Sequence, residues 1–191
     1  MGGPLQLSEV LLKVLGIDPG SLITGYGIVL KGSRGRLIHL CDGEVRAAPS
    51  LPLPERLLYI SRTIERVIEE NRPDVVAIES IFFAKNVRSA IMLGQARGVL
   101  LLSAASKGLR IFEYDPRSIK LAVTGYGNAT KDQVQKMVNM LLKTTGTRRP
   151  DASDALAAAI CHINHSAKGM EGIGAGSHKR SARTSLRILG S

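Results

Sequence analysis

Four acidic residues stand where strands or helices of this chain are expected to end or begin. Asp18 closes an apolar, strand-like run just before Pro-Gly, and Glu79 closes a second short apolar run. Asp151 and Asp154 fall in the first turn of an expected helix, three residues apart, so both carboxylates project from one helix face. Carboxylates without a nearby set of histidines and cysteines suit Mg²⁺ or Mn²⁺ rather than Zn²⁺. Two such ions can stabilise the attacking and leaving oxygens of an in-line phosphoryl displacement.

Each of these acidic residues also has an ordinary structural interpretation. An Asp before Pro-Gly, such as Asp18, is commonly a turn residue, and a strand-terminal Glu usually points to solvent. Acids in the first turn of a helix often only complement the helix dipole. The order of the four, a strand-end Asp, a strand-end Glu and then Asp-x-x-Asp at a helix start, favours a metal site over four unrelated positions.

The charge of the chain favours a polyanionic partner. The 191 residues include 26 Lys and Arg against 16 Asp and Glu, which gives a formal net charge of +10 and a pI near 10.0. This balance raises the expectation of a nucleic acid partner, although ribosomal proteins and other enzymes share it. A basic protein with an acidic metal site is typical of a nuclease, in which cations hold the nucleic acid backbone and carboxylates hold the ions.

The composition argues against several other classes of protein. The cysteines are Cys41 and Cys161, outside any CxxC spacing, which disfavours a zinc site or a disulfide framework and indicates an intracellular protein. The longest apolar runs, near residues 99–105 and 155–161, are too short to span a membrane, so no membrane partner is expected. The N-terminus lacks the basic region of a secretory signal.

The spacing of apolar and turn residues predicts an α/β domain. The first three strands can pair as an antiparallel meander, and the later strands alternate with helices. If the first and fourth strands are neighbours, Asp18 and Glu79 converge at one end of the sheet, and the last helix can bring Asp151 and Asp154 there. We expect strands at residues 11–17, 24–30, 36–46, 74–79 and 109–113, and helices at residues 55–71, 87–107, 116–123, 131–142 and 151–162.

The folded domain is expected to span residues 14–165. Residues 1–13 are an N-terminal extension, and residues 166–191 form a Gly-, Ser-, Lys- and Arg-rich basic tail that we expect to be disordered. Within helix 87–107, Gly94 and Gly98 lie one turn apart, which predicts a close packing contact either inside the chain or at a dimer surface.

Six segments stand out in order along the chain. They are LGIDPGSLITGY at 15–26, AIESIFFAKN at 77–86, LGQARG at 93–98, FEY at 112–114, KDQVQKMV at 131–138 and DASDAL at 151–156. Together they resemble the RuvC family of Holliday junction resolvases. The resemblance implies an RNase H-like mixed sheet flanked by helices, and a homodimer in the bacterial cytoplasm. It also implies Mg²⁺-dependent nicking of two opposed strands of a four-way DNA junction in recombination and repair.

The same resemblance implies roles for the acidic residues. Asp18, Glu79, Asp151 and Asp154 would bind two Mg²⁺ ions per site, for which Mn²⁺ would substitute. All four matching positions are acidic in this chain. Hydrolysis would leave a 5′-phosphate and a 3′-hydroxyl at each nick.

Five further residues are expected to bind the DNA. Phe82 matches an aromatic residue implicated in junction contact, although packing of this loop residue into the core is the alternative. Lys120 and Lys131 match basic positions near the scissile phosphate, and Lys85 and Arg88 are basic residues beside the expected site. The sequence leaves open whether either of the first two lysines is catalytic, which bases are preferred, and whether a branch-migration complex such as RuvAB docks on the protein.

Two functions from other classes are the alternatives. A phosphotransferase of the actin or sugar-kinase type also places Asp-x-Gly after a first strand, but it needs two such domains and a second phosphate loop, for which this chain has no room. A non-catalytic DNA-binding scaffold would use only the basic surface. It would leave the four acidic residues unexplained.

Overall fold

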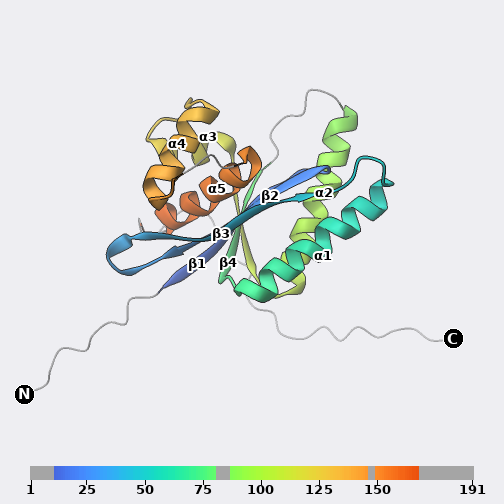
Figure 1. Ribbon diagram of the computed structural model, residues 1–191, viewed down its shortest axis with the longest axis horizontal. Coiled ribbons are helices and arrows are strands. Elements are labelled where there is room, and N and C mark those ends of the chain that lie inside the picture. The colour runs from blue at the N-terminus through green and yellow to red at the C-terminus, as the bar shows by residue number, and fades with distance from the viewer. Residues whose placement is uncertain (1–10, 81–86, 146–148, 168–191) are drawn as a thin grey trace, which may run out of the picture.

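A five-stranded mixed sheet with helices on both faces makes up the part of the chain that the structure describes, residues 11–80, 87–145 and 149–167 (Figure 1). The structure is a computed structural model. The strands are β1 (Leu12–Asp18), β2 (Ile23–Lys31), β3 (Leu37–Arg46), β4 (Val75–Glu79) and β5 (Arg110–Tyr114). The helices are α1 (Leu53–Asn71), α2 (Val87–Ser106), α3 (Pro116–Thr124), α4 (Lys131–Leu142) and α5 (Pro150–Ala167), with a short 3₁₀ turn at Ser33–Gly35.

The strand order, β3-β2-β1-β4-β5, confirms the α/β fold expected from the sequence. β1, β2 and β3 form an antiparallel meander, whereas β4 runs parallel to β1 and β5 runs parallel to β4. In the β1–β4 pair Ile17 is aligned with Ile78, one residue before each strand ends. Asp18 and Glu79 therefore lie at the same edge of the sheet, because parallel strands end on the same side.

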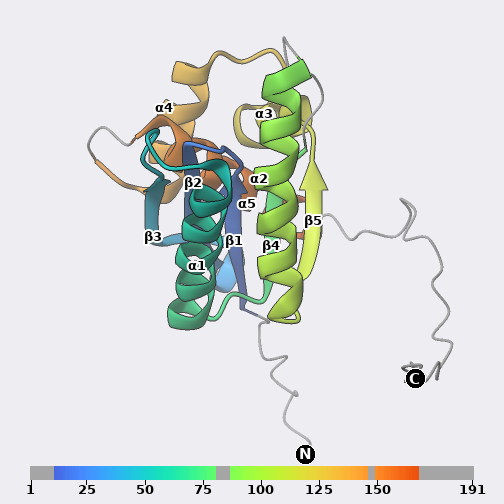
Figure 2. The same ribbon diagram turned by 90° about the vertical axis from the view of Figure 1, so that its right-hand side faces the viewer.

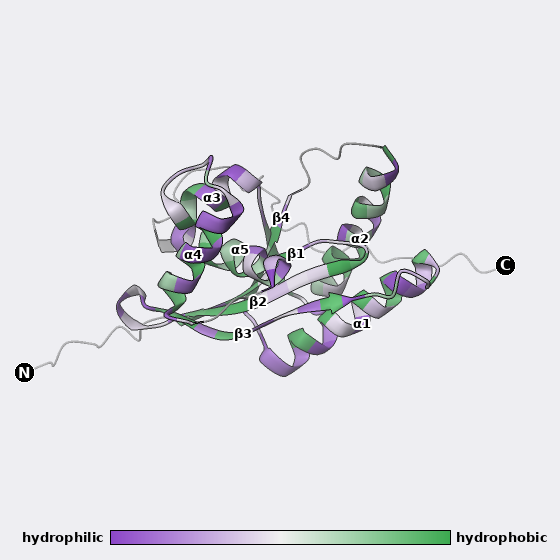
Figure 3. Cartoon of the chain, turned by 45° about the horizontal axis from the view of Figure 1, so that its top comes forward, coloured by the Kyte–Doolittle hydropathy of each residue, from purple (hydrophilic) through white to green (hydrophobic). Residues whose placement is uncertain are grey.

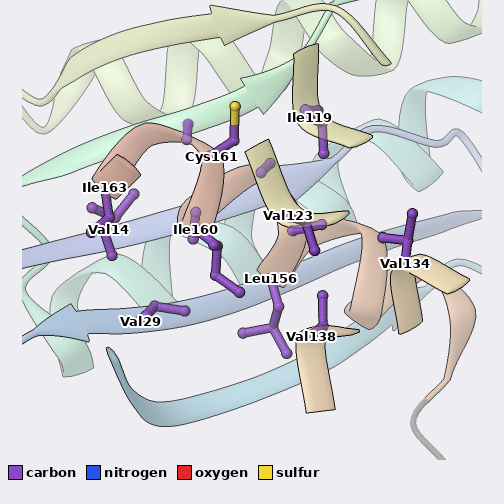
Figure 4. Close-up of a cluster of buried hydrophobic side chains, with 14 of the residues drawn as sticks. Val14, Val29, Ile119, Val123, Val134, Val138, Leu156, Ile160, Cys161 and Ile163 are labelled. Carbon is purple, nitrogen blue, oxygen red and sulfur yellow. The ribbon is translucent and has the colours of Figure 1, made fainter. Parts of the chain in front are cut away.

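The two faces of the sheet bury two separate cores. α1 and α2 cover one face, and α3, α4 and α5 cover the other (Figures 1 and 2). Along β1 the side chains alternate, so that Val14 joins the core under α5 and Leu15 joins the core under α1. Figure 4 shows Val14 of β1 beside Ile163 of α5, in the same cluster as Val29 of β2 and Leu156 of α5. Each fully buried Leu or Ile adds about 1.5–3 kcal/mol to stability.

Helix α5 lies so close to β1 and β2 that glycine is required beneath it. A Cβ atom at Gly16 would stand 1.9 Å from the carbonyl oxygen of Ala155, and one at Gly25 would stand 1.9 Å from that of Asp151. Both distances are far below any van der Waals contact, so a side chain at either position would push the helix away. Gly16 on β1 and Gly25 on β2 thus let the N-terminal half of α5 rest directly on these two strands, close to Asp18 at the end of β1.

The start of α1 and the end of α5 differ from the bounds expected from the sequence. α1 begins at Leu53 rather than at residue 55, because Pro54 lies in its first turn, where a proline needs no hydrogen-bonding N–H. The helix is amphipathic, as its alternating polar and apolar bands indicate (Figure 3). α5 continues past residue 162 to Ala167, since Ile163 is still buried against the sheet.

Helix α2 packs on the sheet with one side and leaves the other side open. Ala96, Leu100 and Ala104 are buried, whereas a Cβ atom at Gly94 or Gly98 would meet no described atom within 4 Å outside the helix itself. Of the two alternatives for these glycines, packing inside the chain is therefore not seen among the described residues, and a dimer surface is still a prediction. By length and composition alone, α2 is also the one described helix that would be long and apolar enough to cross a membrane.

Candidate active site

Strands β1 and β4, helices α3 and α4 and the first turns of α5 together enclose one cavity. Its volume is about 280 Å³, and its polar lining is made by three carboxylates and two ammonium groups. The carboxylates are those of Asp18, Glu79 and Asp154, and the ammonium groups are those of Lys120 and Lys131. The ordinary interpretations of Asp18 as a turn residue and of Glu79 as a solvent-facing residue do not describe these surroundings.

Asp18 lies at the electrostatic centre of the cavity. Burial raises its pKa to about 8, and the negative charges of Glu79, Asp154 and Asp151 add to the effect, while Lys131 opposes it. Burial, followed by the charge of Asp154, also raises the pKa of Glu79. Ionised carboxylates held this close repel one another, so the cavity favours a bound cation.

Asp151 stands beside the cavity rather than in its lining. Its pKa is raised by burial first, and then by the neighbouring charges of Glu44 and Asp154. It lies one helical turn before Asp154 on α5. The structure thus brings all four expected acidic residues into one electrostatic cluster, with Asp151 at its rim.

Helix caps place the two lysines. α4 begins with a capping box, in which the Thr130 hydroxyl accepts from the Gln133 N–H at 3.3 Å, so that Lys131 is the first residue of the helix. Its Nζ donates to Oδ2 of Asp154 at 3.2 Å. α3 is capped by Asp115, and its cationic residue Lys120 lowers the pKa of Glu79.

The donor set of the cavity fits a hard divalent cation. Carboxylate oxygens are the ligands that Mg²⁺ prefers, and mutual repulsion among them is relieved when a cation binds. Among the described residues, no three His, Cys, Asp or Glu side chains are gathered closely enough to enclose an ion as they stand. The acidic side chains would have to turn toward one another, and Lys131 would have to release Asp154.

Of the other expected DNA-binding residues, the structure describes only Arg88, and it lies elsewhere. Arg88, in the first turn of α2, lines a separate cavity between the N-terminal ends of α1 and α2 together with Arg56 and Ile91. The structure does not bring it to the acidic cavity. Phe82 and Lys85 lie outside the described residues.

Sequence reasoning missed one acidic residue of this cluster. Glu44 on β3 is aligned with Gly25 of β2, which is aligned in turn with Asp18 of β1. Its side chain is buried. Only the register of the β1–β2 and β2–β3 pairs shows that Glu44 lies near Asp18. The alternation of residue types along an edge strand does not reveal that register.

Comparison with known proteins places the chain in a family. The family model for crossover junction endodeoxyribonuclease RuvC matches residues 14–162. The RuvC protein of Geotalea uraniireducens is 48% identical over 155 residues, which is 81% of this chain and 90% of that protein. The RuvC protein of Myxococcus xanthus is 42% identical over 177 residues, which is 92% of each chain.

Solved structures agree with the sequence comparisons. Thermus thermophilus RuvC in complex with a Holliday junction substrate superposes with a TM-score of 0.78 at 33% identity, covering 83% of this chain and 96% of that one. The yeast mitochondrial Holliday junction resolvase Ydc2 superposes with a TM-score of 0.58 at 12% identity, over 81% of this chain and 80% of its own, which is a likeness of fold alone. The expected RNase H-like fold is thereby confirmed. The chain belongs to the RuvC family of crossover junction endodeoxyribonucleases.

Proposed function

We propose that this protein resolves four-way DNA junctions by nicking two opposed strands, in homologous recombination and repair. The observation that carries the proposal is the cavity in which three carboxylates and two lysines meet at the end of the sheet, in a member of the RuvC family. The carboxylates supply oxygen ligands for divalent ions, and the lysines supply cations for a phosphate. A scaffold protein would need neither arrangement.

The acidic residues hold the ions in this proposal. Asp18, at the end of β1, is the residue best placed to contact both ions, because Glu79 lies on one side of it and α5 on the other. Asp151 and Asp154 complete the set. The ions would be Mg²⁺, with Mn²⁺ able to substitute. Two bound ions would stabilise negative charge on the attacking and leaving oxygens. Hydrolysis would leave a 5′-phosphate and a 3′-hydroxyl.

The two lysines hold the phosphate. Lys131 is the first residue of α4, where free backbone N–H groups also favour an anion. With an ion held by Asp154, the Lys131 ammonium, which donates to Asp154 in this structure, would be available to a phosphate. Lys120 faces the same cavity from α3 and offsets negative charge there. Arg88 is proposed to bind the junction away from this cavity, and Phe82 and Lys85 are still predicted to contact the DNA.

We propose further that the chain is a homodimer that associates through the open side of α2. Val87 is 76% exposed, Ile91 is 57% exposed and Leu102 is 69% exposed, and Gly94 and Gly98 lie between them. Apolar and small residues at this helical spacing let a second helix approach closely, as in paired helices generally. A four-way junction has two-fold symmetry, so a two-fold dimer offers one site to each opposed strand.

The cellular setting follows from the relatives. The relatives from Geotalea uraniireducens and Myxococcus xanthus are bacterial proteins, and we propose that this protein acts in the bacterial cytoplasm. Docking of a RuvAB branch-migration complex is still a prediction. Co-purification of RuvAB with the junction-bound protein would support it.

Cleavage of a mobile synthetic four-way junction by the purified protein tests the proposed function. Mobility lets the preferred bases reach the crossover. We expect paired nicks at symmetric positions in Mg²⁺ or Mn²⁺, none in EDTA, and ligatable 5′-phosphate ends. Junction binding without nicking in either metal would instead favour the scaffold function.

A further inference from the structure

Glu44 is a buried carboxylate that the proposed mechanism does not use. Its side chain is 0% exposed although its backbone lies on β3, an edge strand of the sheet. Its Oε1 atom is buried without a hydrogen-bond partner among the described residues. A buried carboxylate oxygen without a partner costs stability, so its presence calls for a reason other than folding.

The other oxygen of Glu44 ties β3 to the start of α5. Oε2 accepts a hydrogen bond from Arg46 and lies 3.5 Å from Nη1 of Arg149. The carbonyl oxygen of Arg149 accepts from the Ser153 N–H at 3.1 Å, which places Arg149 at the beginning of the helix. Glu44 also acts on Asp151: after burial, the charge of Glu44 and a hydrogen bond between the two carboxyl groups raise the pKa of Asp151, and that bond requires one of the two groups to hold a proton. The Glu44 side chain thus meets the Arg149 side chain at the start of α5 and also acts on the first acidic residue of the helix.

These contacts restrict the orientation of Asp151, whereas the other three acidic residues are held in other ways. Asp18 and Glu79 are fixed by the paired strands that carry them, and Asp154 is held by Lys131. Asp151 lies outside the cavity lining, in the first turn of α5, where its backbone packs on Gly25 but its side chain has no lysine partner like that of Asp154. Its hydrogen bond to the buried Glu44 restricts the directions in which its carboxylate can point.

We propose that Glu44 is a positioning residue that sets the orientation of Asp151 and of the first turn of α5 for metal binding. The inference rests on the proposed function, since it assumes that Asp151 binds an ion. Residues that orient metal ligands in this way commonly account for about ten- to hundred-fold in metal affinity. Glu44 acts through Asp151 and does not itself contact the ion.

The test measures Mn²⁺ binding to the full chain by calorimetry, without DNA, alongside thermal unfolding. Glu44→Ala should weaken Mn²⁺ binding about ten-fold or more. Glu44→Gln should stay within about three-fold of wild type, because the Gln amide can still donate to Asp151. Glu69→Gln, on an exposed ion pair with Lys107, is the matched control and should leave binding unchanged.

The Gln variant distinguishes positioning from direct ligation and from simple charge. If Glu44 bound the ion, or acted only through its charge, Gln would lose affinity as Ala does, and the inference would be overturned. A Glu44→Ala protein that is less stable but binds Mn²⁺ as wild type does would also overturn it, and would leave Glu44 a structural residue.

Arg149→Ala keeps the inference testable if Glu44→Ala does not fold. Arg149 is 63% exposed, so its removal spares the core. Loss of a cation beside an acidic cluster should tighten Mn²⁺ binding if only charge matters, whereas loss of the Glu44 contact should weaken it about three-fold if position matters. Tighter or unchanged binding would overturn the inference. Failure of the wild-type protein to bind Mn²⁺ at all would refute the proposed function instead.

Discussion

Replacing Asp18 by Asn should make the metal-free protein more stable, and increasingly so as the pH rises. Burial raises the pKa of Asp18 from 3.8 to about 8 in the fold. Between these two pH values the folded chain therefore binds more protons than the unfolded chain, and its free energy of unfolding falls as pH rises. Asn has no proton to lose, so the variant escapes this penalty.

The size of the effect follows from the shift. Each pH unit inside the window costs about 1.4 kcal/mol, so the penalty grows by about 2 kcal/mol between pH 6.5 and pH 8. His162 is buried with its pKa lowered to about 4, which makes stability rise with pH up to 6.5, its ordinary value. The contribution of His162 opposes that of Asp18 below pH 6.5 and is absent above it. The range from 6.5 to 8 therefore excludes the contribution of His162, and the comparison of wild type with Asp18→Asn assigns the remainder to Asp18.

Urea unfolding of both proteins in EDTA, at pH 6.5 and pH 8, measures this difference. We expect Asp18→Asn to gain about 2 kcal/mol on wild type between the two pH values, and saturating Mg²⁺ to stabilise wild type selectively. The variant should also fail to nick junctions while it still binds them. A stability difference that does not change with pH would refute the reasoning about the buried charge.

Three further predictions concern the surroundings of the site. Lys131→Ala should lower the rate of nicking on the order of 10²-fold at saturating Mg²⁺ with the fold intact, and a wild-type rate in single-turnover assays would remove its role. Gly98→Arg should convert the proposed dimer into a folded monomer, because a Cβ atom at Gly98 meets no described atom within 4 Å outside its own helix. Sedimentation would contradict this if the variant stayed dimeric. Gly25→Ala should lower the free energy of unfolding by about 1–3 kcal/mol and abolish nicking, because its Cβ would displace α5. An unchanged urea midpoint of unfolding would count against the close approach of α5 to β2.

The positions of the strands were predictable because the apolar runs were short, separate and bounded by turn residues, whereas the adjacency of the first and fourth strands was only assumed. Asp18 and Glu79 end two such runs, so once β1 and β4 are neighbours the two carboxylates must share an edge. Asp154 could be placed from its position in the first turn of a helix that follows the last strand. Its role in metal binding is still a prediction.

The contacts made by α5 could not be predicted from residue types. The fit of this helix on Gly16 and Gly25 depends on backbone distances that no periodicity encodes. The recruitment of Glu44 depends on the register between β2 and β3, which contains an irregularity at Ile28 and Val29. The partner of Gly94 and Gly98 could not be predicted either, because a pair of small residues indicates a close approach without identifying what approaches.

The most direct test of the central claim compares wild type with Asp154→Asn on a mobile four-way junction. Glu69→Gln serves as the matched control, because it removes a carboxylate from an exposed ion pair on α1, outside the acidic cavity. We predict symmetric, EDTA-sensitive nicks from wild type and the control, and junction binding without nicks from Asp154→Asn. Metal-dependent nicking by Asp154→Asn at the wild-type rate would contradict the assignment of this cavity as the active site.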